Sequence, residues 1–300
     1  MIAADGIHHG ETARRGIAFR WLLSGFLLAA PLVEPQADQI ISIAYLKEGM
    51  SELNDSDKLV GLQMWAEEMT GLTHMRTEVT GVNTMHELMR GLESKSVNFA
   101  LFNTGAYLGN YRILKPYLAN EILGVQRSEQ LFEDYLILVK NSSPIHDFRD
   151  LRNRRLAISK EHILYNDYLE YLVKKISGKQ AAYFFKKIDD APTPSRAVLE
   201  VFFGGSDACL APRHIFELTA ALNPQVSKDL RIIHSSGAIF IPAVLVAFNS
   251  EPEETRKLIV RAMLDVQLTL RGKQILELFK IKGLVPAAAE DFTPMFKIYE

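Results

Sequence analysis

The sequence is poor in cysteine, since the only one among its 300 residues is Cys209. A single cysteine excludes an intramolecular disulfide. The neighbouring residues at 208–211 are apolar, and free cysteines in such surroundings are mostly buried. We therefore expect Cys209 to lie in the core as an inert thiol.

A large excess of charge of either sign is also missing. The formal net charge is −2 and the sequence pI is about 6.5, so the chain has no general basic field that would attract nucleic acid or anionic lipid. The basic cluster at 152–155 is expected to be solvated loop charge. Hydrophobic residues make up 48% and charged residues 23%, which is typical of a globular protein with a full core.

Sequence motifs for catalysis and for metal binding are missing as well. The histidines form neither an H-E-x-x-H pair nor another close ligand spacing. The sequence has no G-x-S-x-G nucleophile elbow and no P-loop. We therefore expect no enzyme, no catalytic residue, no metal site and no cofactor.

The N-terminal segment has the features of a secretory signal. Three arginines precede the apolar run 21–33, and a polar stretch containing a proline follows it. A positive region, a short apolar region and small residues near its end characterise a signal peptide, and the run is shorter than the roughly 20 residues that span a bilayer. We predict a signal peptide at 1–37, cut near Ala30 or Ala37. Because no cysteine closely follows the run, we expect a periplasmic protein without a lipid anchor; the alternative is a buried N-terminal helix.

From residue 38 onwards, short apolar runs alternate with longer amphipathic ones. Such β-α-β alternation predicts an α/β fold with mostly parallel sheets flanked by helices. The pattern starts again near residue 135, which suggests two lobes of about 100 residues each. Strands are predicted at 40–46, 76–80, 97–102, 135–139, 155–159, 184–188, 207–210, 230–233 and 243–248, and helices at 59–69, 83–92, 104–114, 163–176, 195–203 and 253–279.

Candidate ligand-binding residues follow from this arrangement, because open α/β sheets bind ligands beyond the carboxyl ends of their strands. Tyr45 in the strand 40–46 and Tyr107 in the helix 104–114 would form aromatic walls of the ligand site, or else pack in the core. Asn103 and Thr104 would hydrogen-bond the ligand or cap the next helix. The residues that we place directly after the strands are Tyr45, Asn103, Thr104, Ser159 and Asp207.

Four groups of segments resemble the phosphonate-binding branch of the ABC-transporter solute-binding proteins. They occur in the family's order between residues 40 and 295. The first is MHELMRGL with VNFALF, and the second, FRDLRNRRLA, is similar to the entry into the family's second lobe. The others are AVL with GGSDA and, near the C-terminus, GK followed by GLVPA and DFTP. The first group ends with AYL at 106–108, so the four groups lie at 85–108, 148–157, 197–208 and 272–294.

The resemblance implies a two-lobed type II periplasmic-binding-protein fold with a hinge. Lobe 1 would comprise 38–133 and 238–300, and lobe 2 would comprise 134–237. The protein would be a monomer that captures a small ligand, an oxyanion or phosphonate-like compound, between its lobes and delivers it to an inner-membrane ABC permease. The alternatives are a ligand sensor that docks on a histidine kinase sensor domain, and an enzyme on the same fold.

One turn departs from the family's pattern. The resemblance implies a turn rich in serine, threonine and glycine after a strand of the second lobe, whereas this chain has SKEHILYN at 159–166. Ser159 is the remaining small hydroxyl residue, and Glu161 would repel a dianion. Lys160 and His162 would partly compensate, and His162 is therefore a further candidate ligand-binding residue. By resemblance, Asp207 would contact a cationic group of the ligand, or else close a turn with its own backbone.

Overall fold

The structure is a computed structural model that describes residues 40–47, 55–160 and 163–299. All of them belong to the contact unit Ala37–Glu300. The predicted signal peptide at 1–37 and the candidate residue His162 lie outside the described residues. Among the described residues, no helix has the length and apolar character needed to cross a lipid bilayer.

Sheet A is a mixed six-stranded sheet. Its strands are β1 (Ile40–Leu46), β2 (Arg76–Val82), β3 (Phe99–Asn103), β4 (Leu118–Gln126), β10 (Ala243–Phe248) and β11 (Gly283–Ala287). They lie in the order β11-β4-β10-β3-β1-β2, in which β1 runs parallel to both β2 and β3. The strand β10 is antiparallel to β3 and β4, and β11 is antiparallel to β4. The C-terminal part of the chain therefore returns to the sheet that its first strands form.

Sheet B is a mixed five-stranded sheet. Its strands are β5 (Glu133–Lys140), β6 (Arg155–Ile158), β7 (Lys187–Asp190), β8 (Ala208–Pro212) and β9 (Leu230–Phe240). Their order is β7-β6-β8-β5-β9, with β6 parallel to β7 and β8 and with β5 antiparallel to β8 and β9. Two sheets of this kind flanked by helices confirm the predicted α/β fold class.

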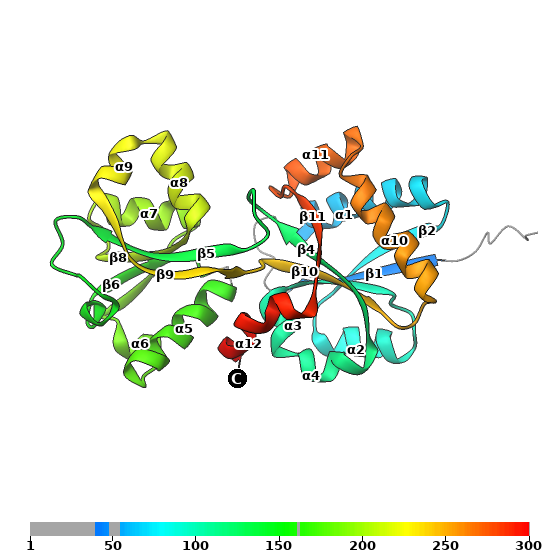
Figure 1. The fold of residues 1–300 in the computed structure, drawn as a ribbon, viewed down its shortest axis with the longest axis horizontal. Coiled ribbons are helices and arrows are strands. Elements are labelled where there is room, and N and C mark those ends of the chain that lie inside the picture. The colour runs from blue at the N-terminus through cyan, green and yellow to red at the C-terminus, as the bar shows by residue number, and fades with distance from the viewer. Residues whose placement is uncertain (1–39, 48–54, 161–162, 300) are drawn as a thin grey trace, which may run out of the picture. The chain divides into compact units, whose positions relative to one another are not determined.

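Helices cover both faces of each sheet (Figure 1). On sheet A, α1, α10 and α11 lie on one face and α2, α3 and α4 on the other, and on sheet B α7, α8 and α9 lie opposite α5 and α6. The helices are α1 (Asp55–Thr73), α2 (Met85–Glu93), α3 (Thr104–Gly109), α4 (Tyr111–Leu114), α5 (Ile163–Ser177), α6 (Ala181–Phe184), α7 (Pro194–Phe202), α8 (Arg213–Leu222), α9 (Pro224–Asp229), α10 (Glu253–Val266), α11 (Leu270–Leu278) and α12 (Thr293–Tyr299). The short 3-10 helices are η1 (Lys115–Tyr117), η2 (Phe148–Leu151) and η3 (Ala289–Phe292).

Alternate residues of β1 point to opposite faces of sheet A, as the two-residue period of a strand requires. Ile43 and Tyr45 pack in the hydrophobic cluster that includes Trp65 of α1. Ala44 and Leu46 belong to the cluster on the other face, beneath α2. Tyr45 is therefore fixed under α1, on the same side of the sheet as α10 and α11.

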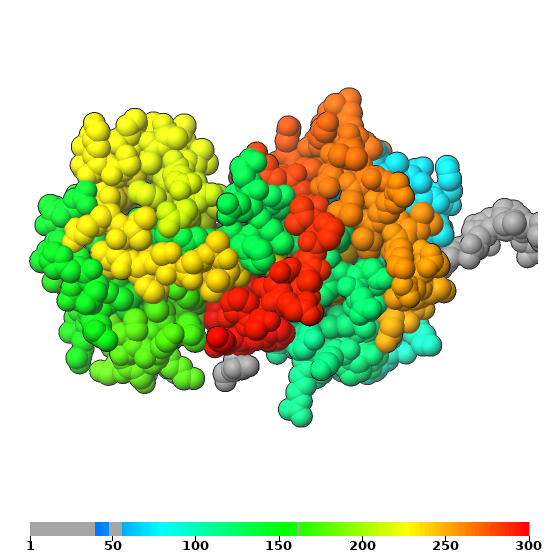
Figure 2. Space-filling view, in the orientation of Figure 1, coloured from blue at the N-terminus to red at the C-terminus, as the bar shows by residue number. Residues whose placement is uncertain are grey.

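The chain passes between the sheets twice. It leaves sheet A after β4, at residues 127–132, and returns between β9 and β10 through Ile241 and Pro242. The predicted lobe boundaries at 134 and 237 lie close to these two connections and stay a prediction. The helix α12 packs against β9 and α5, which both belong to the sheet B segment, and Figure 2 shows the red atoms of α12 beside the yellow atoms of β9.

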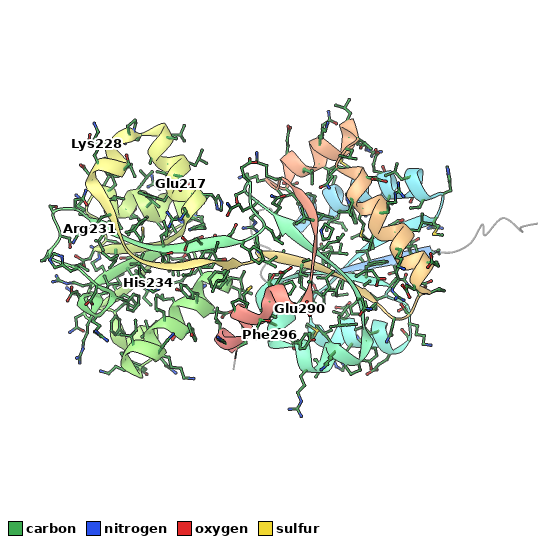
Figure 3. All side chains as sticks on the ribbon, in the orientation of Figure 1. Glu217, Lys228, Arg231, His234, Glu290 and Phe296 are labelled. Atoms are coloured by element: carbon green, nitrogen blue, oxygen red, sulfur yellow. The ribbon has the colours of Figure 1, made fainter. Side chains whose placement is uncertain are left out.

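Arg231 of β9 holds the loop that follows β5 (Figure 3). Its guanidinium donates hydrogen bonds to the carbonyl oxygens of Lys140 and Asn141, at 2.6 and 2.8 Å, and of Ser143 and Ile145, at 2.9 and 2.5 Å. A planar fork of five N–H donors suits such a divergent set of acceptors. The loop is thereby tied to the neighbouring strand.

Three predicted elements of secondary structure are wrong in detail. The predicted helix at 253–279 is divided into α10 and α11, because Thr269 caps α11 by accepting the backbone N–H of Gly272 at 2.9 Å. The predicted strand at 184–188 is instead the end of α6 followed by β7, because Phe184 and Phe185 pack on Phe148, with ring centroids 5.6 and 6.2 Å apart. The predicted helix at 104–114 is broken into α3 and α4 at Asn110, whose amide group donates to the carbonyl oxygen of Ala106. The predicted burial of Cys209 is confirmed: it lies in β8, and burial raises the pKa of its thiol.

Candidate ligand-binding site

Three predicted site residues come together at the carboxyl ends of β1 and β3, on one edge of sheet A. Tyr45 is 1% exposed and lies near the end of β1, where its ring passes over Gly81 of β2. A Cβ at Gly81 would lie 2.8 Å from the Tyr45 ring, so the close approach requires glycine there. Asn103 ends β3, and Thr104 begins α3. This edge is where parallel strands present ligand-binding residues.

Asn103 caps α3, which was one of its two predicted roles. Its Oδ1 accepts a hydrogen bond from the backbone N–H of Ala106 at 2.8 Å. The backbone N–H of Thr104 donates to the carbonyl oxygen of Pro242 at 3.3 Å, across to the connection that leads into β10. These bonds fix the first turn of α3 next to the return connection between the sheets.

Two buried hydroxyl groups stand out at the strand ends. Thr104 is 0% exposed and Ser159, directly after β6, is 1% exposed. Within the described residues, neither Thr104 Oγ1 nor Ser159 Oγ has a hydrogen-bond partner. Leaving a buried hydroxyl unsatisfied costs about 1–3 kcal/mol, and such groups in native structures call for an explanation. Both hydroxyls are therefore available to donate to a bound ligand.

The helices that follow these two residues are in contact. Thr104 starts α3 and Ser159 precedes α5, and α3 packs against α5 and α12. Tyr299 of α12 donates a hydrogen bond from its hydroxyl to Asp167 Oδ2 of α5 at 2.8 Å. A Cβ at Gly105 would lie 2.7 Å from that hydroxyl and 3.1 Å from that carboxylate oxygen, so glycine permits the contact. Elements of both sheets therefore meet at the first turn of α3.

Burial controls the ionisation of this contact. Desolvation raises the pKa of Asp167, and the hydrogen bond from Tyr299 opposes that rise. Desolvation, with the charge of Asp167 as a second cause, raises the pKa of Tyr299. Tyr299 is therefore a neutral donor at neutral pH, and Asp167 is the group whose ionisation the protein disfavours.

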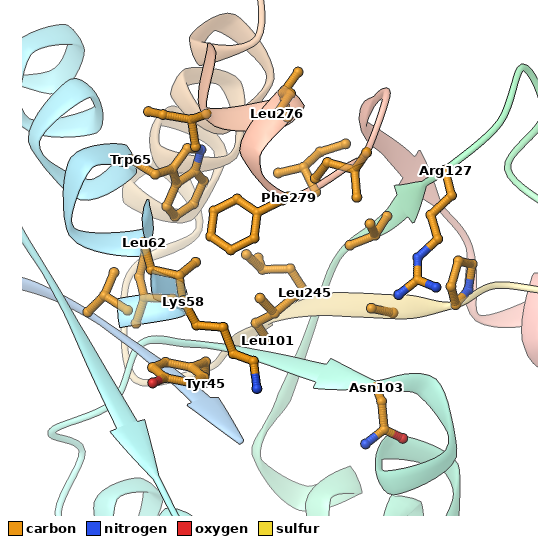
Figure 4. Close-up of a pocket in the computed structure, with 18 residues that line it drawn as sticks. Tyr45, Lys58, Leu62, Trp65, Leu101, Asn103, Arg127, Leu245, Leu276 and Phe279 are labelled. Carbon is orange, nitrogen blue, oxygen red and sulfur yellow. The ribbon is translucent and has the colours of Figure 1, made fainter. Parts of the chain in front are cut away.

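A cavity of about 120 Å³ opens at the same edge of sheet A. Tyr45 and Asn103 are among its lining residues, together with two cationic residues that the sequence interpretation did not single out, Lys58 and Arg127 (Figure 4). Lys58 lies in the first turns of α1 and Arg127 directly follows β4. Arg127 would have been a candidate if the strand β4 had been predicted, because Arg127 directly follows the end of that strand.

Two predicted site residues lie elsewhere. Tyr107 packs in an aromatic cluster with Phe102 and Phe292, at centroid distances of 6.0 and 5.6 Å, and it does not line the cavity. Asp207 directly precedes β8, at the start of the strand predicted at 207–210, so it does not lie at a strand's carboxyl end; its role in ligand binding stays a prediction. Its Oδ2 accepts the backbone N–H of Arg155 at 2.8 Å, and its own N–H donates to the Arg155 carbonyl oxygen at 3.0 Å. This pairing ties together the amino-terminal ends of β6 and β8, on the opposite edge from Ser159.

No metal site is found in the part of the chain that the structure describes, where no three His, Cys, Asp or Glu side chains are grouped to hold an ion. The arrangement at the strand ends offers hydroxyl and amide groups with two cationic side chains nearby. Groups of these kinds can bind a ligand by hydrogen bonds and charge.

Comparison with known proteins decides the family. The model of the periplasmic substrate-binding proteins of phosphonate ABC transporters matches residues 49–292. The chain belongs to this family. It is thus a periplasmic substrate-binding protein that holds a small ligand between two lobes for an ABC permease, which confirms the predicted function, and the family is one of transport proteins and not of enzymes.

Solved structures show the same fold. PhnD1 from Prochlorococcus marinus, in complex with methylphosphonate, is 16% identical, with a TM-score of 0.56 over 87% of this chain and 97% of that one. XAC2383 from Xanthomonas citri, bound to ATP, is 14% identical, with a TM-score of 0.60 over 87% and 96% of the two chains. A binding protein of an ABC phosphonate transporter from Pseudomonas aeruginosa is 12% identical, with a TM-score of 0.53 over 86% and 84%. A search of curated protein sequences found no significant match.

Proposed function

We propose that the ligand carries a phosphorus oxyanion, as a phosphonate does, and that the hydroxyls of Thr104 and Ser159 donate hydrogen bonds to it. The observation that carries this proposal is the burial of both hydroxyls without a hydrogen-bond partner in the described residues. Thr104 begins α3 and Ser159 lies four residues before α5, and these two helices, one from each sheet segment, are in contact. An oxyanion has several acceptor oxygens and can take both bonds at once.

Two similar structures support a phosphorus oxyanion. One was solved with methylphosphonate and the other with ATP, and both ligands contain tetrahedral phosphorus with charged oxygens. Lys58 and Arg127 at the same edge of sheet A would add positive charge near the head group.

The remaining predictions complete the proposal. The chain would be exported by a signal peptide at 1–37 and act as a monomer free in the periplasm. Lobe 1, at 38–133 and 238–300, would close on lobe 2, at 134–237, and the closed form would dock on the permease. Docking on a histidine kinase sensor domain stays the alternative prediction, and stimulation of the reconstituted permease's ATPase by liganded protein would distinguish the two.

Thermal unfolding of purified protein tests the ligand class. Methylphosphonate, phosphate, sulfate, ATP and a neutral osmolyte are each added at millimolar concentration. A ligand present at 100 times its dissociation constant stabilises by about 2.7 kcal/mol, which is a clear rise in Tm. We expect methylphosphonate to raise Tm and the osmolyte to leave it unchanged. A rise with sulfate or neutral solutes but not with any phosphorus compound would contradict the proposal.

A further inference from the structure

The cavity beside the proposed head-group site is apolar over most of its wall. Leu62 and Trp65 of α1 face Leu276 and Phe279 across it (Figure 4). Strand residues form the base, namely Ile43, Leu101 and Leu245. Trp65 and these aliphatic side chains surround a space of about 120 Å³ that no side chain fills, although protein cores are normally close-packed.

One end of the cavity is polar. Lys58 extends from α1 toward Asn103, and the guanidinium of Arg127 lies on the same side of the cavity (Figure 4). Lys58 is only 7% exposed, so its charge acts where water screens it weakly. Lys58 and Arg127 thus bring two positively charged side chains to this end of the cavity.

The polar end continues into the proposed head-group site. Asn103 lines the cavity and is followed by Thr104. Pro242 also lines the cavity, and its carbonyl oxygen accepts the N–H of Thr104. If the oxyanion of a ligand is bound by Thr104, the organic group attached to its phosphorus therefore lies next to the opening of the cavity.

We propose that this cavity takes the apolar substituent of the ligand, so that the protein prefers phosphonates with a short alkyl chain or a small ring over methylphosphonate. The inference rests on the proposed function. An apolar cavity of roughly 150 Å³ accommodates a benzene ring, so the present one suits a chain of about four carbons. Apolar walls with a few polar groups at one end are the usual design of small-molecule sites.

The expected preference follows from the transfer of methylene groups out of water. Each buried methylene tightens binding roughly fourfold. Butylphosphonate should therefore bind roughly 50-fold more tightly than methylphosphonate, because three additional methylenes enter the cavity. Octylphosphonate exceeds the space and should gain nothing over butylphosphonate.

Calorimetric titration of the wild-type protein and two variants with methyl-, butyl- and octylphosphonate tests this preference. Leu276→Trp fills the cavity from α11, whereas Leu278→Trp places the same side chain on the same helix at a residue that is 40% exposed and outside the lining. We expect L276W to bind butylphosphonate no more tightly than methylphosphonate, and L278W to keep the wild-type preference.

The outcomes separate the inference from the proposed function. Equal affinity of the wild-type protein for methyl- and butylphosphonate would overturn the inference and leave the phosphorus oxyanion in place. Loss of the butyl preference in both variants would also overturn it. Pentanoate is titrated in parallel: if no phosphonate binds while pentanoate does, and L276W abolishes that binding, the head-group proposal fails and the apolar subsite stands. If none of these probes binds, both fail.

Discussion

Replacing Thr104 by valine should change ligand affinity and ligand-free stability in opposite directions. Valine has the same shape as threonine without the hydroxyl, and the Thr104 side chain is fully buried, with no hydrogen-bond partner for its Oγ1 in the described residues. The folded protein without ligand therefore loses only an unsatisfied polar group. The liganded protein loses a hydrogen bond to an anion.

The magnitudes follow from these two effects. Removing an unsatisfied buried hydroxyl should stabilise the ligand-free protein by about 1 kcal/mol, which raises Tm by about 2–4 °C for a protein of this size. A hydrogen bond to a charged group is worth about 1.5–3 kcal/mol, so affinity for methylphosphonate should fall by roughly 10- to 150-fold. Ser159→Ala should have the same two effects, because Ser159 Oγ is also buried and without a partner in the described residues.

Differential scanning fluorimetry of ligand-free protein and calorimetric titration with methylphosphonate measure the two effects. Thr219→Val is the matched control, since Thr219 is also buried, at 7% exposed, but its Oγ1 donates to the Ile215 carbonyl oxygen at 2.7 Å. This variant should lose stability and keep its affinity. If Thr104→Val lowers Tm and leaves affinity unchanged, the hydroxyl has a structural role and the reasoning is refuted.

Three further variants test other features. Asp167→Asn should be more stable than the wild type at pH 7, because burial disfavours the charged Asp167 carboxylate and asparagine can still accept the hydrogen bond from Tyr299. The difference in stability should shrink as pH falls through the raised pKa of Asp167, because the wild-type carboxylate then becomes protonated in the folded state. Arg231→Lys should cost about 1–3 kcal/mol in urea unfolding, because an ammonium cannot reach four carbonyl oxygens. Gly272→Ala should lower Tm, costing about 1–3 kcal/mol, since its Cβ would lie 1.7 Å from the Val266 carbonyl oxygen.

Each of these variants has a control. Asp150 is exposed and accepts two backbone N–H groups, which lower its pKa, so Asp150→Asn should destabilise at pH 7 and lose its effect in acid. Arg261 lies on the surface of α10, so Arg261→Lys should leave urea unfolding unchanged. A Cβ at Gly71 would meet no neighbouring atom within 4 Å, so Gly71→Ala should not lower Tm. Equal behaviour of any variant and its control would contradict the corresponding argument.

Strands with β-branched and apolar residues could be predicted well from the sequence. The predicted strands at 40–46 and 243–248 match β1 and β10, since both are buried on two faces and read as continuous apolar runs. The strands β4 and β11 were not predicted. The first half of β4 contains alanine, asparagine and glutamate, and β11 contains a proline, so pairing with neighbouring strands decides their conformation.

The candidate site could be predicted only in part. Tyr45 and Asn103 were chosen because they lie at strand ends, and both line the cavity, whereas their contact with a ligand stays a prediction. Asp207 was counted among the residues after strands although the strand predicted at 207–210 begins with it, and in the structure it pairs with the backbone of Arg155. Lys58 was missed because its burial is a property of tertiary packing, and a lysine near the start of a helix is usually solvated. The missing partners of the Thr104 and Ser159 hydroxyls are likewise visible only in three dimensions.

The buried single thiol makes this chain convenient for fluorescence work. Cys209 is inaccessible, and burial suppresses formation of the reactive thiolate. Cysteines introduced at Tyr183 of α6 and Leu270 of α11, which are 74% and 78% exposed, would react with maleimide dyes, whereas the buried Cys209 would not be labelled. Energy transfer between the two dyes would then report, one molecule at a time, whether a phosphonate draws the two halves of the protein together.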